Sequence, residues 1–459
     1  MKLPLKMFHD GKAPLANGLR RDNILLMSDT EFENNHGFIQ WAFPTNVKSR
    51  SLSTAPVLDA ASATTLSNRQ DVVEFLEKMV VRFLEFLGRN DHWIVPYHHN
   101  HARISRAITS LKLLHSSELA SWFYQEVIRL AGADFDKMHK SNKFWSSYAS
   151  PLSDQIAGCF VGLAIGDALG APVEFCRRGT FAEVTAYREG GKFNLPSGAW
   201  TDDTAMALCL ADSLINNNGL NPNNLLECFC EWASDGVNTS TGVAVGIGQN
   251  TLRTLGSYKR DGLLEAKAFG SKNDGNGSIM RLAAVPCTYA NDIEAGNSVA
   301  RAQSKTTHAS TLAEECSHYL SELITHIFQG RTLDEARHIL SKQTWSDPVT
   351  HALLIELKGL DATAIRSSGY VIDTLQAAIW AAQTTQSFAA AVLKAVNLGD
   401  DADTVGAVTG QIAGAIYGYS KVPKSLKDGL IDERKLYVTS QFLCAPRVDE
   451  KLLPSFKGR

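Results

Sequence analysis

The first third of the chain lacks cysteine, and the whole chain lacks paired cysteine motifs. All 8 cysteines lie at or beyond Cys159, and Cys228 and Cys230 are separated by a single residue. The Cys-x-x-Cys spacing of structural zinc sites is therefore missing. Cysteines without such pairing are typical of reduced, buried thiols, so we expect a cytoplasmic protein.

Strong charge imbalance and long apolar runs are also missing. The 45 lysines and arginines nearly balance the 48 acids, giving a formal net charge of -3, which does not indicate nucleic-acid binding. The N-terminal segment reaches an acid before any long apolar run, which argues against a secretory signal. The uncharged run at 405–420 is Gly-rich and too short to span a membrane. We expect a soluble protein with no membrane partner.

The two parts of the chain differ in composition. A chain of 459 residues is long for one domain, and residues 1–150 carry 18 basic residues against 15 acids, a positive balance absent from the rest. The polar stretch 136–150 is predicted to be a linker. We place the boundary near Ser150, which gives domains at 1–150 and 151–459.

Apolar spacing predicts helices. Between Asp71 and Leu87, apolar residues recur every three or four positions, the period of an amphipathic helix with a broad buried face. The segments 102–114 and 118–130 repeat the pattern, and the alternation typical of strands is scarce. We therefore predict an all-α protein in which a smaller helical domain precedes a larger one.

Glycine recurs at every fourth position in two segments, 158–170 and 406–418. Each glycine inside a helix costs about 1 kcal/mol relative to alanine, so four on one face require a compensating gain. Close approach of two helix backbones provides that gain. Because Asp167 lies in the first stripe and Asp403 just before the second, tight packing would bring acidic groups together.

Two acidic clusters, TDDT at 201–204 and DDADT at 400–404, each precede an apolar run. Either cluster alone is best interpreted as a helix N-cap, which needs one short polar side chain. Carboxylate and hydroxyl oxygens also suit hard divalent cations such as Mg²⁺ and Mn²⁺. Two clusters favour the cation site, because three acids in four residues repel one another unless they are screened.

Other segments carry weaker signals. The turn GNGSIMR at 275–281 combines free amides with Arg281 and suits a phosphate, although such turns are more often plain connections. His308 by itself is more often a packed residue than a catalytic one. The cluster HHNH at 98–101 can bind metal, but it lacks a cysteine or acid at zinc-finger spacing, so a solvated cluster is the better interpretation.

With these motifs assembled, residues 154 to about 440 resemble the ADP-ribosylglycohydrolase family, the relatives of dinitrogenase reductase-activating glycohydrolase. The matching segments occur in family order: GCFVGLAIGDALGAPVEF at 158–175, WTDDTAMALCLADSLI at 200–215, GNGSIMRLAAVP at 275–286, the His308 segment, and NLGDDADTVGAVTGQIAGAIYG at 397–418. The resemblance implies an orthogonally packed helical bundle with two divalent cations, Mg²⁺ or Mn²⁺. By position, it implies the metal ligands Thr201, Asp202, Asp203, Asp401, Asp403 and Thr404, with Asp400 flanking them.

The resemblance also implies catalytic and substrate-binding roles. Asp202 or Asp203 would accept a proton from a water that is activated by the cations and attacks the anomeric carbon of ribose. Glu174 falls at the place of a mobile glutamate beside the distal ribose. The residues implied to line the ADP-ribose pocket are Asn276, Gly277, Ser278, Met280 and His308.

The bond expected to be hydrolysed joins ribose to an acceptor side chain, with arginine as the first choice. Some arginine-acting relatives carry Asp-Ile-Gly where this chain has Gly246-Ile247-Gly248. Serine-linked, nucleobase-linked and small-molecule substrates therefore stay open as alternatives.

Residues 20–130 resemble the conserved region of the opioid growth factor receptor family. The matching segments are HGFIQWAFP at 36–44 and NHARISRA at 100–107, followed by Ser110 and Leu111. The family name says little about biochemistry. For Trp41 and Phe43, core packing is a better interpretation than a ligand cage.

Two functions follow from these resemblances. The first is a metal-dependent hydrolase that removes ADP-ribose from a modified protein, acting as immunity against an ADP-ribosyltransferase toxin. The alternative is a binding protein whose N-terminal region occludes the active site of such a transferase, with hydrolysis secondary or absent. Binding would survive loss of the acidic residues, whereas hydrolysis would not.

Overall fold

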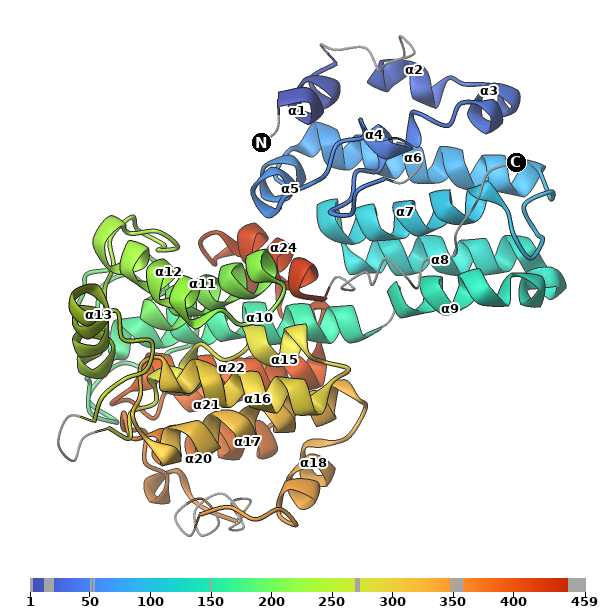
Figure 1. The fold of residues 1–459 in the computed structure, drawn as a ribbon. Helices are drawn as coiled ribbons and strands as arrows, with labels where there is room; N and C mark the ends of the chain where they lie inside the picture. The colour runs from blue at the N-terminus through green and yellow to red at the C-terminus, as the bar shows by residue number, and fades with distance from the viewer. Residues whose placement is uncertain are drawn as a thin grey trace. The chain divides into compact units, whose positions relative to one another are not determined.

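The computed structural model describes residues 3–11, 20–49, 52, 54–148, 151–268, 273–346, 349, 357 and 359–444 (Figure 1). Within these ranges the regular elements are helices, and strand-like pairing is limited to isolated bridges such as Gly190 with Leu195. The prediction of an all-α protein is confirmed. The chain divides into two compact units, residues 1–154 and 155–459, which we describe separately.

The first unit is built around an aromatic core. In chain order its helices are α1 (Leu3–His9), α2 (Arg21–Leu25), α3 (Asp29–Asn34), α4 (Ile39–Ala42), α5 (Ala60–Ser67), α6 (Gln70–Arg89), α7 (His99–Leu114), α8 (Ser117–Ala131), η1 (Gly132–Met138) and α9 (His139–Tyr148). The helices predicted from apolar spacing are confirmed as α6, α7 and α8. Phe83 of α6 is fully buried, with its ring centroid 5.6 Å from that of Phe32 and 5.7 Å from that of Phe123. These rings join α3, α6 and α8.

The prediction of a linker at 136–150 is wrong for residues 136–148. Residues 149 and 150 lie outside the residues that the structure describes. Residues 136–148 belong to η1 and α9. Trp145 is fully buried, and its indole N–H donates to Ser105 Oγ on α7 at 2.9 Å. Trp145 thus helps to anchor a helix whose sequence is mostly polar.

Arg103 on α7 fastens α3 in place. Its guanidinium group donates to the carbonyl oxygens of Phe32 at 3.0 Å, Glu33 at 3.0 Å and Asn35 at 3.2 Å. Carbonyl groups at the C-terminal end of a helix lack partners within that helix, so the arginine satisfies them. Burial lowers the pKa of Arg103 to about 10, which leaves the group charged at neutral pH.

Replacing Arg103 by methionine is expected to lower the free energy of unfolding of the first unit by about 3 kcal/mol or more, because buried carbonyl groups lose a charged donor. Urea denaturation followed by circular dichroism measures the loss. Arg129→Met is the matched control, because Arg129 is 67% exposed and its ion pair with Glu126 is worth less than about 1 kcal/mol. Equal losses in the two variants would contradict the role given to Arg103.

The second unit surrounds two central helices, α10 and α22, which lie side by side (Figure 1). In chain order the helices from Pro151 onward are α10 (Pro151–Gly170), η2 (Ala171–Val173), α11 (Asp202–Asn217), α12 (Pro222–Asp235), α13 (Gln249–Asp261), α14 (Gly277–Met280), α15 (Ala284–Thr288), α16 (Ile293–Lys305), α17 (Thr311–Phe328), α18 (Leu333–Leu340), η3 (Ala362–Ala364), α20 (Val371–Gln383), α21 (Phe388–Val396), α22 (Ala402–Tyr417), η4 (Tyr419–Lys421), α23 (Lys424–Asp428) and α24 (Glu433–Cys444). α22 packs against α17, α20 and α21.

The backbones of α10 and α22 are in direct contact, as the glycine stripes predicted. The contacts pair glycines in antiparallel order: Gly158 with Gly414, Gly162 with Gly410, and Gly166 with Gly406. A Cβ atom on Gly166 would lie 2.0 Å from the Gly406 carbonyl oxygen, and one on Gly410 would lie 1.9 Å from the Gly162 oxygen. No side chain fits between the helices. The C-terminal end of α10 therefore meets the N-terminal end of α22.

α10 is an internal helix. By length and composition alone, Leu152–Val173 could cross a membrane. In the folded chain, 94% of its most apolar window is buried inside the protein, as in the core helix of a soluble protein.

Candidate active site

Asp167, near the C-terminal end of α10, holds the start of α11 in place. Its fully buried carboxylate accepts hydrogen bonds from the backbone N–H groups of Thr201 at 2.9 Å and Thr204 at 3.1 Å. The hydroxyl groups of the same threonines donate to it at 2.8 Å and 2.6 Å. Asp167 therefore supplies the acceptor that a helix N-terminus usually takes from its own N-cap side chain.

The N-cap residues of α11 and α22 do not use their side chains as caps. Thr201 occupies the N-cap position of α11 and Asp401 that of α22, and neither side chain accepts a capping hydrogen bond. The N-cap interpretation is therefore wrong for Thr201 and Asp401, although Asp403 Oδ1 accepts the backbone N–H of Thr404 at 2.9 Å. Another reason is needed for the acids at these helix starts.

The structure brings the two clusters together, although they lie far apart in the sequence. Thr201 Oγ1 lies 3.3 Å from Asp203 Oδ2 and 3.4 Å from Asp403 Oδ2. One carboxylate oxygen from each of Asp167, Asp203 and Asp403 lies within 4.8 Å of the other two. The glycine contact between α10 and α22 explains this meeting, because Asp167 holds the start of α11 and Asp403 lies at the start of α22.

Glu174 forms a second group with Asp401 and Asp403, whose ligand oxygens also lie within 4.8 Å of one another. Two backbone hydrogen bonds hold this segment: Phe175 N–H donates to Asp400 O at 2.6 Å, and Asp400 N–H donates to Cys176 O at 2.7 Å. Phe175 has φ 64°, which is strained for a bulky side chain. Strain of this kind is typical of functional sites.

Arg178 fastens the same segment to neighbouring loops. Its guanidinium group donates to the carbonyl oxygens of Leu398 at 3.0 Å and Ile365 at 2.7 Å, and also to that of Ala362. Gly399 allows close approach, because a Cβ atom there would lie 2.6 Å from the Cys176 carbonyl oxygen. The backbones that carry Glu174 and Asp401 are therefore held together.

The carboxyl groups of the site repel one another in a buried environment. Burial raises the pKa of Asp202, Asp203 and Asp403 well above the usual range, and neighbouring carboxylates raise it further. Burial followed by the charge of Asp403 raises the pKa of Glu174 to about 10, and burial raises the pKa of Asp401 to about 6. Within the described ranges, no lysine or arginine forms an ion pair with Asp202, Asp203 or Asp403.

This donor set fits divalent cations. Asp203 Oδ1 and Glu174 Oε2 are buried and have no hydrogen-bond partner among the residues that the structure describes. Buried charge without a partner is costly, and carboxylate and hydroxyl oxygens are the ligands that Mg²⁺ and Mn²⁺ prefer. Asp400 is exposed, as expected for a flanking residue. The predicted ligands, all buried or half-buried at the two helix starts, are Thr201, Asp202, Asp203, Asp401, Asp403 and Thr404.

Of the predicted substrate-binding residues, Asn276 contacts the acidic group directly. Its side-chain amide donates to Asp401 Oδ2 at 2.5 Å and to Thr374 Oγ1 at 2.9 Å. His308 lies against the same turn, because a Cβ atom on Gly277 would lie 2.9 Å from His308 Cε1. Asn276, Gly277 and His308 therefore form one group beside Asp401.

Ser278 and Met280 are packed inside the protein. The Ser278 hydroxyl is fully buried and accepts a hydrogen bond from Ser317 Oγ at 3.1 Å. Met280 is 4% exposed. Their roles in substrate binding stay predictions.

The suggestion that Arg281 balances a phosphate is wrong. Its fully buried guanidinium group donates to the side-chain and backbone oxygens of Gln303 and to Thr307 Oγ1, each at 2.9 Å. Thr307 Oγ1 in turn lies 2.9 Å from His308 Nδ1. Arg281 thus helps to orient the His308 ring through the hydroxyl group of Thr307.

The segment 246–248 lies against the first acidic cluster. A Cβ atom on Gly246 would lie 2.1 Å from Asp202 Oδ1, and Gly246 has φ +81°. An aspartate at position 246 would require either the Asp202 carboxylate or the loop to move. The close approach of Asp202 therefore explains why glycine fits at position 246, where some relatives have the aspartate of Asp-Ile-Gly.

Asp167 and Thr374 were not among the predicted site residues. For Asp167 a signal was present, because it is the one acid in the first glycine stripe. Thr374 lies within α20 and carries no such signal, since its contact with Asn276 depends on tertiary packing.

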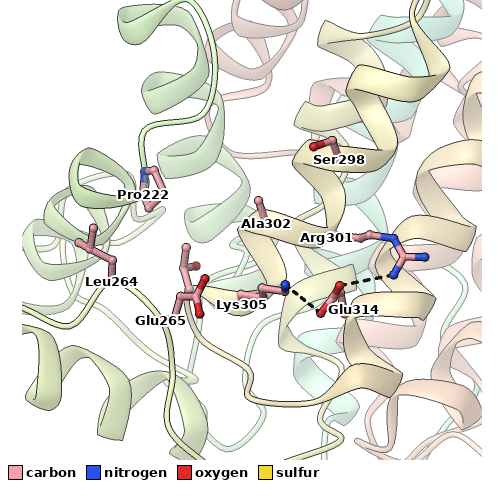
Figure 2. A pocket seen from close by; sticks show the side chains of 9 residues that line it. Pro222, Leu264, Glu265, Ser298, Arg301, Ala302, Lys305 and Glu314 are labelled. Atoms are coloured by element: carbon pink, nitrogen blue, oxygen red, sulfur yellow. Dashed lines mark hydrogen bonds and ion pairs between the residues drawn. The ribbon is translucent and has the colours of Figure 1, made fainter.

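A separate hollow of about 420 Å³ lies beside α16 (Figure 2). Its lining includes Leu264, Glu265, Arg301 and Lys305, and no lining residue belongs to the acidic group. Glu314 lies 3.4 Å from Arg301 and 3.6 Å from Lys305, as the dashed lines in Figure 2 show. Because the two acids of the lining, Glu265 and Glu314, balance the two cations, this hollow offers no strong anchor for an anionic ligand.

Comparisons with known proteins agree with this geometry. The model of the ADP-ribosylglycohydrolase family matches residues 149–451. ADP-ribosylarginine hydrolase Tri1 of Serratia proteamaculans is 38% identical over 304 residues, covering 64% of this chain and 81% of the relative. ADP-ribosyl-[dinitrogen reductase] glycohydrolase of Rhodospirillum rubrum is 31% identical over 277 residues, covering 59% and 88%.

A solved structure, titled ADP-ribosylglycohydrolase-related protein complex, is similar in fold. It is 33% identical, with a TM-score of 0.57, and the match covers 64% of this chain and 98% of that chain. The predicted bundle is confirmed by this likeness. The chain belongs to the ADP-ribosylglycohydrolase family and is an ADP-ribosyl-acceptor hydrolase.

Proposed function

We propose that the protein removes ADP-ribose from arginine side chains of modified proteins, and that it does so in the cytoplasm with Mg²⁺ or Mn²⁺. The observation that carries this proposal is the group of buried carboxyl groups from α10, α11, α22 and the segment after η2. The name of the Serratia relative favours an arginine acceptor, and that of the Rhodospirillum relative favours a protein substrate. Unpaired cysteines such as Cys159 and Cys209 favour a reducing compartment.

The predicted ligands would hold two cations between the starts of α11 and α22. Bound cations would supply positive charge that offsets the carboxylates, lowers the pKa of water and orients the ribose hydroxyl groups. Thr201 and Thr404 would add neutral oxygen atoms without further repulsion. The ligands named in this proposal are Thr201, Asp202, Asp203, Asp401, Asp403 and Thr404.

The side chains would supply the proton acceptor and orient the substrate. Asp202 or Asp203 would take a proton from the attacking water, whose oxygen bonds to the anomeric carbon while the bond to the arginine nitrogen breaks. The leaving guanidine group takes up a proton and departs as the charged arginine side chain. Glu174, with its unpartnered buried oxygen, would contact the distal ribose.

The group around Asn276 would bind the rest of ADP-ribose. Asn276 is already oriented by Asp401, and Gly277 leaves its backbone accessible to a close partner. Burial lowers the pKa of His308 to about 3, so its neutral ring can offer a hydrogen bond without adding charge. The binding residues in this proposal are Asn276, Gly277, Ser278, Met280 and His308.

Mass spectrometry of a substrate panel tests the acceptor and the cation requirement together. Proteins carrying arginine-linked or serine-linked ADP-ribose, and nucleic acid carrying base-linked ADP-ribose, are incubated with the chain in Mg²⁺, Mn²⁺ or EDTA. We expect arginine-linked ADP-ribose to be released fastest, at least about 100-fold faster with a cation than in EDTA. Faster release from serine would contradict the acceptor, and full activity in EDTA would contradict the cation requirement.

We also propose that the first unit binds an ADP-ribosyltransferase toxin, so that the protein acts as an immunity protein by hydrolysis, by occlusion or by both. The observation that favours a separate binding role is that the first unit is a compact body with its own aromatic core. Affinity capture with a purified transferase tests this. The complex should survive Asp203→Asn and be lost when residues 1–154 are removed, and persistence after the truncation would contradict it.

A further inference from the structure

Histidines of the first unit converge on one carboxylate oxygen. Glu33 projects from α3, His92 lies in the loop after α6, and His98 and His99 stand at the start of α7. Glu33 Oε1 lies 3.3 Å from His92 Nε2, 3.9 Å from His98 Nε2 and 3.0 Å from His99 Nε2. Glu33, which is distant in the sequence, and His92, from the preceding loop, therefore lie against the HHNH segment, although the His92 and His99 side chains are 42% and 38% exposed.

These separations are those of ligands around a small transition-metal ion. In a tetrahedral zinc site, ligand bonds of about 2.0–2.1 Å place neighbouring donor atoms about 3.3 Å apart. The observed separations from Glu33 Oε1 fall on both sides of this value. The donor atoms of Glu33, His98 and His99 already lie within 4.8 Å of one another, so small side-chain rotations close the site.

A second layer of side chains orients Glu33. Asn100, which is fully buried, donates to Glu33 Oε2 at 3.0 Å, and Arg103 donates to Asn100 Oδ1 at 3.1 Å. Arg103 also donates to the backbone carbonyl oxygen of Glu33 at 3.0 Å. With Oε2 held by Asn100, Oε1 faces the histidines. Support of this kind is typical of metal ligands, whose orientation is fixed by hydrogen bonds from outside the first layer.

We propose that Glu33, His92, His98 and His99 form a binding site for a transition-metal ion of the Zn²⁺ class. Imidazole nitrogen together with one carboxylate selects such ions over Mg²⁺, which the oxygen-only site of the second unit favours. The site lies entirely in the first unit. It would join α3 to the start of α7 and give that unit a structural metal.

Ordinary hydrogen bonding does not account for the arrangement of His99. Its Nε2 atom is shielded from solvent and lies 3.0 Å from Glu33 Oε1, yet it has no hydrogen bond of suitable angle to any residue that the structure describes. A histidine held by a simple hydrogen bond would align its N–H with the oxygen. A metal ion between nitrogen and oxygen requires no such alignment.

His98 has a competing partner. Its Nδ1 atom accepts the backbone N–H of Asn100 at 3.2 Å and caps α7. In that tautomer the proton sits on Nε2, so ligation through Nε2 requires the proton to move to Nδ1 and the capping bond to break. Glu33 and His99 form the shortest pair, 3.0 Å apart, and they would bind the ion whether or not His98 does. They are therefore the residues to substitute.

Zinc titration of the full-length chain tests the site. The protein is stripped with EDTA, saturated with excess Mg²⁺ to occupy the oxygen site, and titrated with Zn²⁺ against a chromophoric chelator. We expect one equivalent of Zn²⁺ to bind and the unfolding temperature of the first unit to rise with zinc concentration. The double variant Glu33→Gln/His99→Gln should bind this equivalent at least about 100-fold more weakly.

The matched control is Glu77→Gln/His115→Gln, which removes the same residue types from a pair 3.2 Å apart in the same unit. It should keep the zinc equivalent. Equal zinc affinity in the unsubstituted chain and in the Glu33/His99 variant would overturn the proposal, as would equal loss in both double variants. Should circular dichroism show the first double variant unfolded, His92→Gln replaces it, because His92 is 42% exposed. That variant should weaken binding by at least about tenfold, and unchanged affinity would again overturn the site.

Discussion

An Asp403→Asn variant should release ADP-ribose at least about 1,000-fold more slowly than the unsubstituted chain, yet unfold at no lower urea concentration in EDTA. Asp403 belongs to both carboxylate groups, one with Asp167 and Asp203 and one with Glu174 and Asp401. Its loss would weaken cation binding in both groups and remove several kcal/mol of transition-state stabilisation. In the cation-free chain, the same change relieves repulsion among buried acids, so stability should stay equal or rise.

The measurements are kcat/KM for an arginine-linked substrate in Mg²⁺ and urea unfolding in EDTA. Asp212→Asn is the matched control: Asp212 lies on α11, is half-buried, and accepts a hydrogen bond from Asn238 at 2.8 Å, outside the acidic group. It should keep its activity. If Asp403→Asn lost activity and stability together, unfolding rather than chemistry would explain the loss, and the assigned role would be contradicted.

The second large effect is expected from Gly410→Ala, which should destabilise the second unit by more than about 4 kcal/mol. A methyl group at this position would lie 1.9 Å from the Gly162 carbonyl oxygen and 3.0 Å from the Leu163 backbone nitrogen. Backbone atoms cannot rotate away as the end of a side chain can. The two helices would have to separate, with loss of packing along their whole contact.

Thermal and urea unfolding measure this loss, and Gly256→Ala provides the control. Gly256 lies inside α13, and a Cβ atom there would meet no atom within 4 Å. Alanine should therefore stabilise α13 by about 1 kcal/mol through its higher helix propensity. Similar destabilisation by both alanines would mean that general loss of glycine, rather than the contact of α10 with α22, decides the outcome.

Local sequence patterns were sufficient for much of the fold. The apolar period in α6 and the glycine stripes of α10 and α22 each reflect a face that must be buried or brought close, so they can be read without coordinates. The helix at 139–148 escaped prediction because its sequence is mostly polar and its contacts with α7 and α8, such as that of Trp145 with Ser105, depend on tertiary packing. Composition alone cannot distinguish such a helix from a linker.

For the candidate site, the chemistry of single segments was predictable, but the partners of buried groups were not. The residue types of the two acidic clusters predicted a binding site for hard divalent cations. The capping of α11 by Asp167, the burial of Arg281 beside Gln303 and the approach of Glu33 to His99 all join residues from separate helices. Such pairings depend on tertiary packing, and no local spacing in the sequence encodes them.

The contact of α10 with α22 has a consequence for how acceptor preference can diverge among relatives. Because backbone atoms touch at successive turns, neither helix can slide or rotate by one residue without collision, so the contact fixes the positions of Asp167 and Asp403. New preferences should therefore arise by substitutions in loops beside the carboxyl groups, such as the one carrying Gly246, where a longer side chain needs only a side chain or a loop to shift.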